Sequence, residues 1–166
     1  MAAVPQLSAG ILLYRRTASG TEVFLVHPGG PYWAGKDEGA WSVPKGLIVE
    51  GEEELACARR EFREETGFDA GGTGFERDLG SFSLRSGKRL RVWAVEGDCD
   101  AQALRSNLFE MEWPPRSGRI GRFPEVDRGG WFDRAAALRK IAPGQQPVLD
   151  RFYAEFADPG TATRGT

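Results

Sequence analysis

The pattern of apolar and polar positions along the chain predicts a mixture of strands and helices. Short runs of continuous or alternating apolar residues are typical of β-strands, and they occupy residues 8–15, 22–26, 41–43, 75–84, 89–96, 107–113 and 130–132. The first two runs are apolar at almost every position, as expected of strands that are buried on both faces. Turn residues separate the runs at residues 17–20, in the glycine-rich segment 28–40 and at Ser86-Gly87, and Pro44 ends the short run before it.

Three segments show the periodicity of helices, and they are residues 52–66, 133–141 and 146–156. The first is the clearest, because acidic residues crowd its first turn and Gly67 supplies a stop at its end. The last places Val148, Leu149, Phe152, Tyr153 and Phe156 on one helical face. Strands around one central helix, with two helices at the end of the chain, predict an α/β sandwich.

Length and composition indicate one globular domain. The chain has 166 residues, of which 40% are hydrophobic and 28% charged, and we expect a single domain over residues 1–157 with a flexible tail at 158–166. The net charge of -2 offers no basic excess for a nucleic-acid partner, so an anionic substrate must be held by a metal or a few cations. Whether the protein is a monomer or a homodimer is left open.

Cysteine usage and hydropathy favour a cytoplasmic protein. The two cysteines, Cys57 and Cys99, are too few for a disulfide framework and lack the spacing of a metal site, which favours reduced thiols. The apolar run at residues 9–14 is too short for a signal peptide, and no stretch approaches a membrane span. We therefore expect a cytoplasmic protein with no membrane partner.

The first helix carries the candidate chemistry. At about 100° per residue, Leu55, Ala58, Phe62 and Thr66 form the core-facing stripe of a helical wheel. Beside this stripe Glu61, Glu64 and Glu65 converge at i, i+3 and i+4 spacing, where like charges destabilise a helix by about 0.2–0.5 kcal/mol per pair. The wheel places the basic residues of this helix on its other side. Clustered carboxylates suit hard Mg²⁺ or Mn²⁺, which in turn binds phosphate oxygens; a solvated acidic face is the alternative.

A longer motif surrounds these glutamates. From Gly46 the chain reads GLIVEGEEELACARREFREETGF. Glu52 stands six residues after Gly46, Arg60-Glu61 follow, and the segment closes with Glu64-Glu65, Gly67 and an apolar Phe68. This segment resembles the signature of the Nudix hydrolases at every fixed position.

The resemblance implies a Nudix-type α/β/α sandwich with a mixed sheet, and metal-dependent hydrolysis of a diphosphate linkage. In the family, glutamates matching Glu61, Glu64 and Glu65 bind the metals, the carbonyl group matching Gly46 often joins them, and the position of Glu52 supports the network. Arg60 would orient a carboxylate by a bidentate pair. Glu64 or Glu125, the latter in a loop before a predicted strand, would be the catalytic base.

The residues before the signature bear on the substrate. Trp41-Ser42-Val43-Pro44-Lys45-Gly46 resembles the lead-in of diadenosine and diphosphoinositol polyphosphate hydrolases. Lys45 would hold a phosphate as a point charge, and Trp41 is either a core residue or a base-stacking surface. The proline that ADP-ribose hydrolases carry about fifteen residues after the signature is absent, and Phe82 stands where many diadenosine hydrolases have a tyrosine. The lead-in and the missing proline favour a nucleotide with a polyphosphate chain as the small-molecule substrate, whereas Phe82 counts against a diadenosine compound in particular.

Alternatives remain at this stage. The chain is either an enzyme on dinucleoside polyphosphates or nucleoside triphosphates, an ADP-ribose or sugar-nucleotide pyrophosphatase, or a non-catalytic nucleotide-sensing module of the same fold. Retention of all the signature glutamates favours an enzyme. Tyr32 and Trp33 stack on a base or pack onto their own domain, and His27, the only histidine, is expected to be structural.

Overall fold

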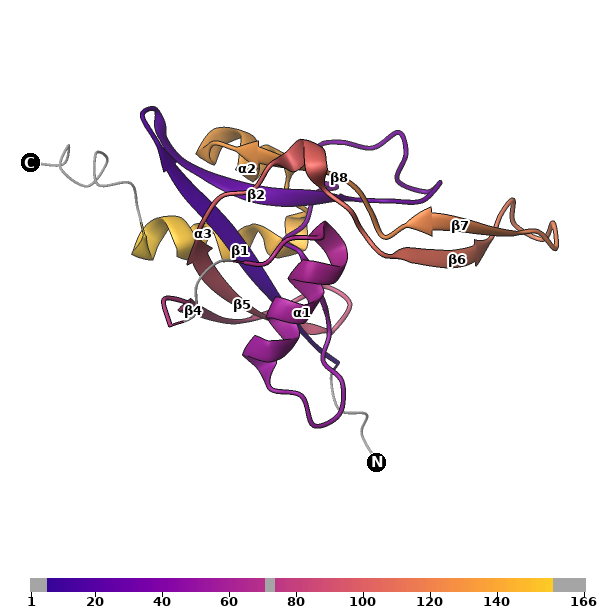
Figure 1. Ribbon diagram of the computed structural model, residues 1–166, viewed down its shortest axis with the longest axis horizontal. Helices are drawn as coiled ribbons and strands as arrows, with labels where there is room; N and C mark the ends of the chain where they lie inside the picture. Colours follow the sequence, from indigo (N-terminus) through magenta and orange to yellow (C-terminus); the bar gives the residue numbers. More distant parts are fainter. Residues whose placement is uncertain (1–5, 71–73, 157–166) are drawn as a thin grey trace, which may run out of the picture.

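A twisted mixed sheet forms the centre of the molecule (Figure 1). The computed structural model describes residues 6–70 and 74–156, so the predicted flexible tail lies outside the described residues. Five strands follow the order β4-β5-β1-β2-β8, with bounds β4 Arg77–Ser83, β5 Arg89–Glu96, β1 Leu7–Thr17, β2 Gly20–Pro28 and β8 Val126–Phe132. The pair β1–β5 is parallel and the other pairs are antiparallel, which confirms the predicted mixed sheet.

Strand β1 pairs with β5 along one edge and with two different strands along the other. Residues 14–17 pair with β2, while residues 8–10 pair with the short strand β3, Lys45–Leu47. Between these two stretches the amide of Ile11 donates to the carbonyl of Pro44 at 3.2 Å. The arrangement fixes the start of the signature segment against β1, whose residues 8–14 are all buried.

Alternate residues of β1 pack into two separate hydrophobic cores, one on each face of the sheet. Ala9, Ile11 and Leu13 face helix α1, Glu54–Thr66, whereas Leu12 and Tyr14 face α2, Arg134–Lys140, and α3, Gln146–Glu155. Because side chains alternate across a strand, a continuously apolar strand needs a helix layer on each face. The helices lie on both sides of the sheet in Figure 1, which confirms the α/β/α sandwich.

The three predicted helices are present with slightly shorter bounds. Helix α1 begins at Glu54 rather than residue 52, with Glu53 as its extended N-cap, and ends at Thr66, with Gly67 as a left-handed C-cap (φ 82°). Asp133 caps α2 through a side-chain bond to the amide of Ala136. Short 3₁₀ turns at Ala101–Ala103 and Pro143–Gln145 complete the helical elements.

The segment before the signature corrects one prediction. Residues 41–43 are not a strand: Trp41 and Ser42 form only isolated bridges, to Ile141 and Val26. The strand begins after Pro44, at Lys45. Pro44 has no amide hydrogen to donate to a neighbouring strand, although its carbonyl accepts from the amide of Ile11 in β1. Regular pairing with β1 therefore begins one residue later, at Lys45. Trp41, buried at 5% exposure, belongs to the core on the α2–α3 face.

A second, two-stranded sheet projects from the body (Figure 1). It pairs β6, Leu108–Glu112, with β7, Ile120–Pro124, in antiparallel register. The sequence predicts the strand at residues 107–113 but not its partner β7. Its sequence signal was the turn-forming stretch Pro114–Pro115 to Gly118 between two short alternating runs. Within the described residues no helix is both long and apolar enough to cross a membrane.

Candidate active site

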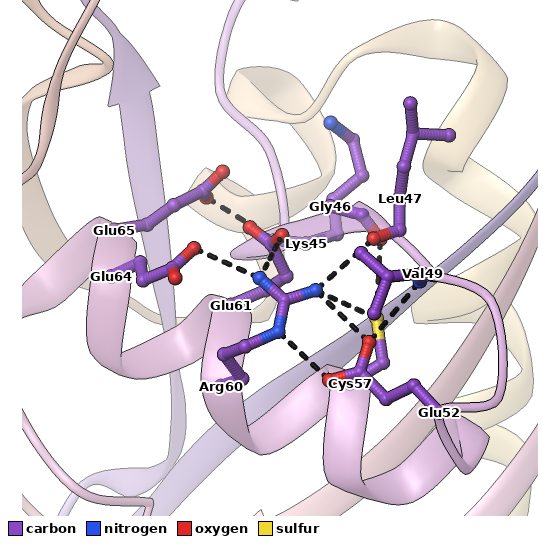
Figure 2. Close-up of polar contacts among 10 residues, drawn as sticks. All are labelled: Lys45, Gly46, Leu47, Val49, Glu52, Cys57, Arg60, Glu61, Glu64 and Glu65. Carbon is purple, nitrogen blue, oxygen red and sulfur yellow. Dashed lines mark hydrogen bonds and ion pairs between the residues drawn. The ribbon is translucent and has the colours of Figure 1, made fainter.

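Helix α1 presents its carboxylates beside the start of β3 because its other face is locked into the core. Ala58, Phe62 and Thr66 are fully buried, and the Phe62 ring lies 6.5 Å from that of Phe24 on β2. This burial confirms the predicted core stripe. With that stripe fixed, Glu61, Glu64 and Glu65 must face β3 and the loop that leads into the helix (Figure 2).

The guanidinium of Arg60 lies among three of the glutamates (Figure 2). Its Nε and Nη2 donate to the two carboxylate oxygens of Glu52 at 2.8 and 3.0 Å, and Nη1 donates to Glu61 and Glu64 at 2.9 and 3.1 Å. The bidentate pair that the resemblance implied is therefore present, with Glu52 as its acceptor. It lowers the pKa of Glu52 to about 2.

The position of Arg60 corrects the wheel interpretation. The wheel places the basic residues of the helix on the side away from the glutamates. In the structure the Arg60 side chain instead contacts Glu61 and Glu64 on the same helix and Glu52 in the loop before it. A long side chain at i to i+4 spacing can do this without any change in the helix. In the metal-free protein Arg60 therefore neutralises part of the acidic cluster.

Gly46 and Glu61 approach so closely that no side chain fits between them. A Cβ built on Gly46 would lie 2.0 Å from Cδ of Glu61 and 2.1 and 2.4 Å from its two oxygens. The carboxylate of Glu61 thus fills the space that a side chain at position 46 would take. Glu61 is only 9% exposed. This burial raises the pKa of its carboxyl, and the charge of Arg60 partly offsets the shift.

Glu65 is held beside the entry to β3. Its Oε1 accepts from the backbone amide of Lys45 at 3.2 Å. Burial raises the pKa of Glu65 to about 8, although the charge and the amide of Lys45 act in the opposite direction. At neutral pH without a metal this carboxyl is therefore largely protonated, and it would ionise on gaining a cation.

Glu125, predicted from its place between a loop and a strand, is tied to the same helix through backbone hydrogen bonds. The amide of Asn107 donates to the carbonyl of Glu64, and the amide of Glu125 donates to the carbonyl of Asn107, at 2.9 and 2.8 Å. The residue is exposed. Partial burial of its carboxyl and the charge of Glu64 raise the pKa of Glu125, and Lys45 lowers it. The fold therefore brings Glu125 and Lys45 to the glutamates of α1.

Two other residues singled out in the sequence lie elsewhere. Trp41 lies on the opposite face of the sheet from α1, where its ring packs against Phe132 at 4.9 Å. The core alternative therefore holds for Trp41, and the expectation that it contacts substrate is corrected. His27 is fully buried, with Nδ1 2.9 Å from Asp127 and Nε2 2.7 Å from the Lys36 carbonyl. These partners fit the structural role expected of it.

The donor set fits a divalent cation of the Mg²⁺ type. The oxygen ligands at hand are carboxylates, with the carbonyl of Gly46, which accepts from Cys57 Sγ at 3.6 Å, beside the helix. Burial raises the pKa values of Glu61 and Glu65 in spite of the nearby charges of Arg60 and Lys45, and a bound cation would favour their ionised forms. Within residues 6–70 and 74–156 no three acidic, histidine or cysteine side chains are already arranged as a cation site, and the guanidinium of Arg60 is bonded to both Glu61 and Glu64.

Comparison with known proteins agrees with this geometry. Residues 4–152 match the NUDIX domain family. An uncharacterized 17.7 kDa protein from the e-segB intergenic region of Enterobacteria phage T4 is 29% identical over 148 residues, which cover 89% of this chain and 95% of that protein.

Solved structures of similar fold cover nearly the whole chain. The Nudix domain of Shewanella oneidensis NrtR, complexed with ADP ribose, has a TM-score of 0.66 at 15% identity, covering 93% of this chain and 90% of that one. A C. elegans Ap4A hydrolase binary complex has a TM-score of 0.62 at 21% identity, covering 90% and 98%. At these identities the likeness is one of fold. With the family match over residues 4–152 and the complete signature folded as loop, helix and stop, the chain belongs to the NUDIX family of hydrolases.

Proposed function

We propose that this protein hydrolyses a diphosphate linkage in a nucleoside diphosphate derivative, with Mg²⁺ or Mn²⁺ as the cofactor. The observation that carries the proposal is the buried carboxylate cluster, in which Glu61 is pressed against Gly46 and Glu65 is held protonated by burial. Full ionisation of such a cluster is unfavourable unless a cation binds there. The cluster lies beside the start of β3, and the 37% exposure of the Glu64 side chain leaves this edge of the helix accessible to a phosphate chain.

The protein residues divide the work of binding and proton transfer. Glu61, Glu64 and Glu65, with the Gly46 carbonyl, form the metal-binding set, and Glu52 fixes Arg60 by its bidentate pair. Divalent metal ions bound there would neutralise the phosphates and acidify the attacking water. Lys45, whose charge acts on both Glu65 and Glu125, holds a phosphate oxygen of the substrate.

The base that takes the proton from water is one of two carboxylates. The Glu64 side chain is 37% exposed and accepts one bond from Arg60, so most of its oxygen lone pairs remain free. Glu125 is exposed and, among the described hydrogen bonds and ion pairs, has no side-chain partner, so its carboxylate is free to accept a proton. Replacing each by glutamine separates the roles, because loss of a metal ligand weakens metal affinity whereas loss of a base lowers kcat at saturating metal.

A polyphosphate nucleotide is the proposed substrate class. The C. elegans neighbour is an Ap4A hydrolase, another neighbour is MutT from Aliivibrio salmonicida and Vibrio cholerae (TM-score 0.55, 17% identity, covering 90% and 96% of the two chains), and a third binds ADP ribose. The lysine next to the metal-binding set favours the longer phosphate chains, since a point charge gains from each anionic group within reach. We therefore expect dinucleoside polyphosphates or nucleoside triphosphates to be preferred over ADP-ribose.

The test is a phosphate-release screen over these nucleotides, sugar nucleotides and diphosphoinositols, with Mg²⁺, with Mn²⁺ and with chelator. We expect turnover that disappears in chelator and returns with metal. Glu64→Gln should lose at least about 100-fold in kcat/KM with a nearly unchanged melting midpoint in the metal-free state, because relief of like-charge repulsion offsets the weakened bond to Arg60.

Glu110→Gln is the matched control, since Glu110 is an exposed glutamate on the projecting hairpin that pairs only loosely with Arg122. Full turnover in chelator would contradict the proposal. Nucleotide binding with no turnover under any metal condition would instead support a nucleotide-sensing module.

A further inference from the structure

A small apolar pocket opens between the loop after β2 and the projecting hairpin β6–β7. Its volume is about 220 Å³. One wall is the loop, with the half-exposed rings of Tyr32 and Trp33, and the other is the hairpin, with Phe109 and Met111. None of the residues that line it is charged. The lining itself therefore offers flat apolar and aromatic faces, and the charged Nζ of Lys36 lies 4.9 Å from the centroid of the Trp33 ring.

Backbone hydrogen bonds join this pocket to the candidate active site. The amide of Gly29, in the pocket wall, donates to the carbonyl of Glu125 at 2.9 Å. Glu125 is bonded in turn to Asn107, and Asn107 to Glu64 on α1. Phe109 lies two residues along β6 from Asn107, a strand distance of about 7 Å. A ligand whose phosphates lie at the glutamates can therefore extend into the pocket.

The two walls contact each other through rings and glycines. The Tyr32 ring meets Trp113 of the hairpin edge to face, with centroids 5.1 Å apart. Gly30 has a φ of 94°, and a Cβ there would lie 3.0 Å from the tip of the Phe109 ring. Gly29 is pressed against the carbonyl of Pro124, where a Cβ would lie at 1.9 Å. These contacts fix the loop against the hairpin, so the two walls are packed together without a ligand.

We propose that this pocket holds the base of the nucleotide substrate, stacked on Tyr32 or Trp33 and backed by Phe109. The inference rests on the proposed function for the chemistry at the glutamates. A volume of about 220 Å³ is below the roughly 300–1,000 Å³ that encloses a whole drug-sized ligand. It suits one flat ring system of a larger ligand. Stacking on aromatic faces tolerates every base, so the pocket sets affinity for nucleotides and discriminates weakly between bases.

The first test observes the pocket without any turnover. Adenosine, which has no phosphate, is titrated into the metal-free protein while the indole N–H resonances of the five tryptophans are followed by NMR. We expect Trp33, and Trp113 through its contact with Tyr32, to shift. Trp41 and Trp93 should not move, because both are buried in the core. If Trp33 and Trp113 do not respond at millimolar adenosine, the pocket proposal is overturned.

The second test uses substitutions of exposed rings, which leave the core intact. Tyr32→Ala and Trp33→Ala should each weaken adenosine binding by about 5- to 150-fold, the effect of one lost stacking partner, while Trp33→Phe should retain most of the affinity. Leu108→Ala is the matched control. Leu108 is 53% exposed on the same hairpin strand, but strand alternation directs it to the face opposite Phe109.

Kinetics separate this proposal from the proposed function. With any nucleotide that the screen shows to be a substrate, Tyr32→Ala and Trp33→Ala should raise KM at nearly constant kcat, because stacking acts equally on ground and transition states. Turnover with an unchanged KM in both variants would overturn the pocket and keep the hydrolase. Adenosine binding at Trp33 without turnover of any nucleotide would keep the pocket and overturn the hydrolase. A Trp33 resonance that shifts with protein concentration alone would indicate a second copy as occupant and overturn the pocket proposal.

Discussion

At the scale of single residues, Gly46 determines the position of Glu61, because a residue without a side chain leaves room for its carboxylate. Its backbone pairs with Ala9 in the sheet, and the carboxylate of Glu61 lies where its side chain would be. The backbone conformation there is not left-handed, so glycine is required for room and not for φ. Sequence comparison alone marks the glycine, whereas the structure shows which carboxylate it positions.

We predict that Gly46→Ala displaces Glu61 and impairs metal-dependent turnover by at least about 10- to 100-fold, the usual effect of disturbing the support of a metal ligand. The overlap should also cost about 1–3 kcal/mol of stability. Metal titration, kcat/KM and urea unfolding measure these effects. Gly35→Ala is the control, because a Cβ at Gly35 meets nothing within 4 Å. A Gly46→Ala protein with full metal affinity would show that Glu61 is not a ligand.

At the scale of elements, helix α1 joins a core-facing stripe to a reactive edge. Phe62 is the anchor of the stripe, since it is fully buried against Phe24 in the core on this side of the sheet. The neighbouring Glu61 is in turn fixed against β3. Any rotation of the helix that exposed Phe62 would also withdraw the glutamates from Gly46 and Lys45.

Phe62→Ala should therefore act through stability and only secondarily through catalysis. Truncating a buried phenylalanine costs about 3–5 kcal/mol, which should lower the denaturation midpoint strongly. Phe75→Ala is the matched substitution, because Phe75 is 81% exposed and should change stability by less than about 0.5 kcal/mol. Equal stability of Phe62→Ala and the parent would contradict the burial of this helix face.

The hairpin β6–β7 is the element that local sequence describes least. The side chains of both strands alternate in exposure, and the sequence predicts the first strand. Nothing in the local pattern of residues shows that the hairpin lies outside the main sheet. The backbone bonds of Asn107 and Glu125 decide this, because they bind the base of the hairpin to helix α1. Both the catalytic candidate Glu125 and the wall of the aromatic pocket depend on these contacts.

At the scale of the whole molecule, the acidic site makes the stability of the metal-free protein depend on pH. Burial raises the pKa of Glu65 to about 8 from an ordinary value of 4.5, and it raises that of Glu61 as well. Between pH 4.5 and about 8 the folded state therefore binds more protons than the unfolded chain. The contribution of Glu65 is fully present below pH 4.5 and is lost as the pH rises through 8. Glu52, with its lowered pKa, acts only between about 2 and 4.5.

We predict that the free energy of unfolding of the metal-free protein falls between pH 5 and 8, by up to about 1.4 kcal/mol per pH unit from Glu65 alone. Urea unfolding at several pH values measures the slope. Glu65→Gln should flatten it, and Mg²⁺ should reduce it, because a bound cation favours the ionised carboxylate. A slope that is zero or positive in chelator would show that Glu65 is ionised in the folded protein.

The sequence by itself determined the layers of the fold and the members of the acidic cluster. Continuous apolar strands demand a helix layer on each face, and a helical period fixes which residues of α1 enter the core, so Phe62 and Glu64 could be assigned to opposite roles from spacing alone. The helix stop at Gly67 followed from its own chemistry. These are local properties, in which the backbone period and the nature of the side chain suffice.

Only the tertiary structure decided the contacts between segments far apart in the chain. Trp41 became a core residue because its segment crosses to the α2–α3 face of the sheet, and Arg60 became a partner of Glu52 because the loop before α1 folds back onto it. The aromatic pocket joins residues about 80 positions apart, and no local pattern relates them. Such contacts arise from how the elements pack together, and so they could be found only in the folded chain.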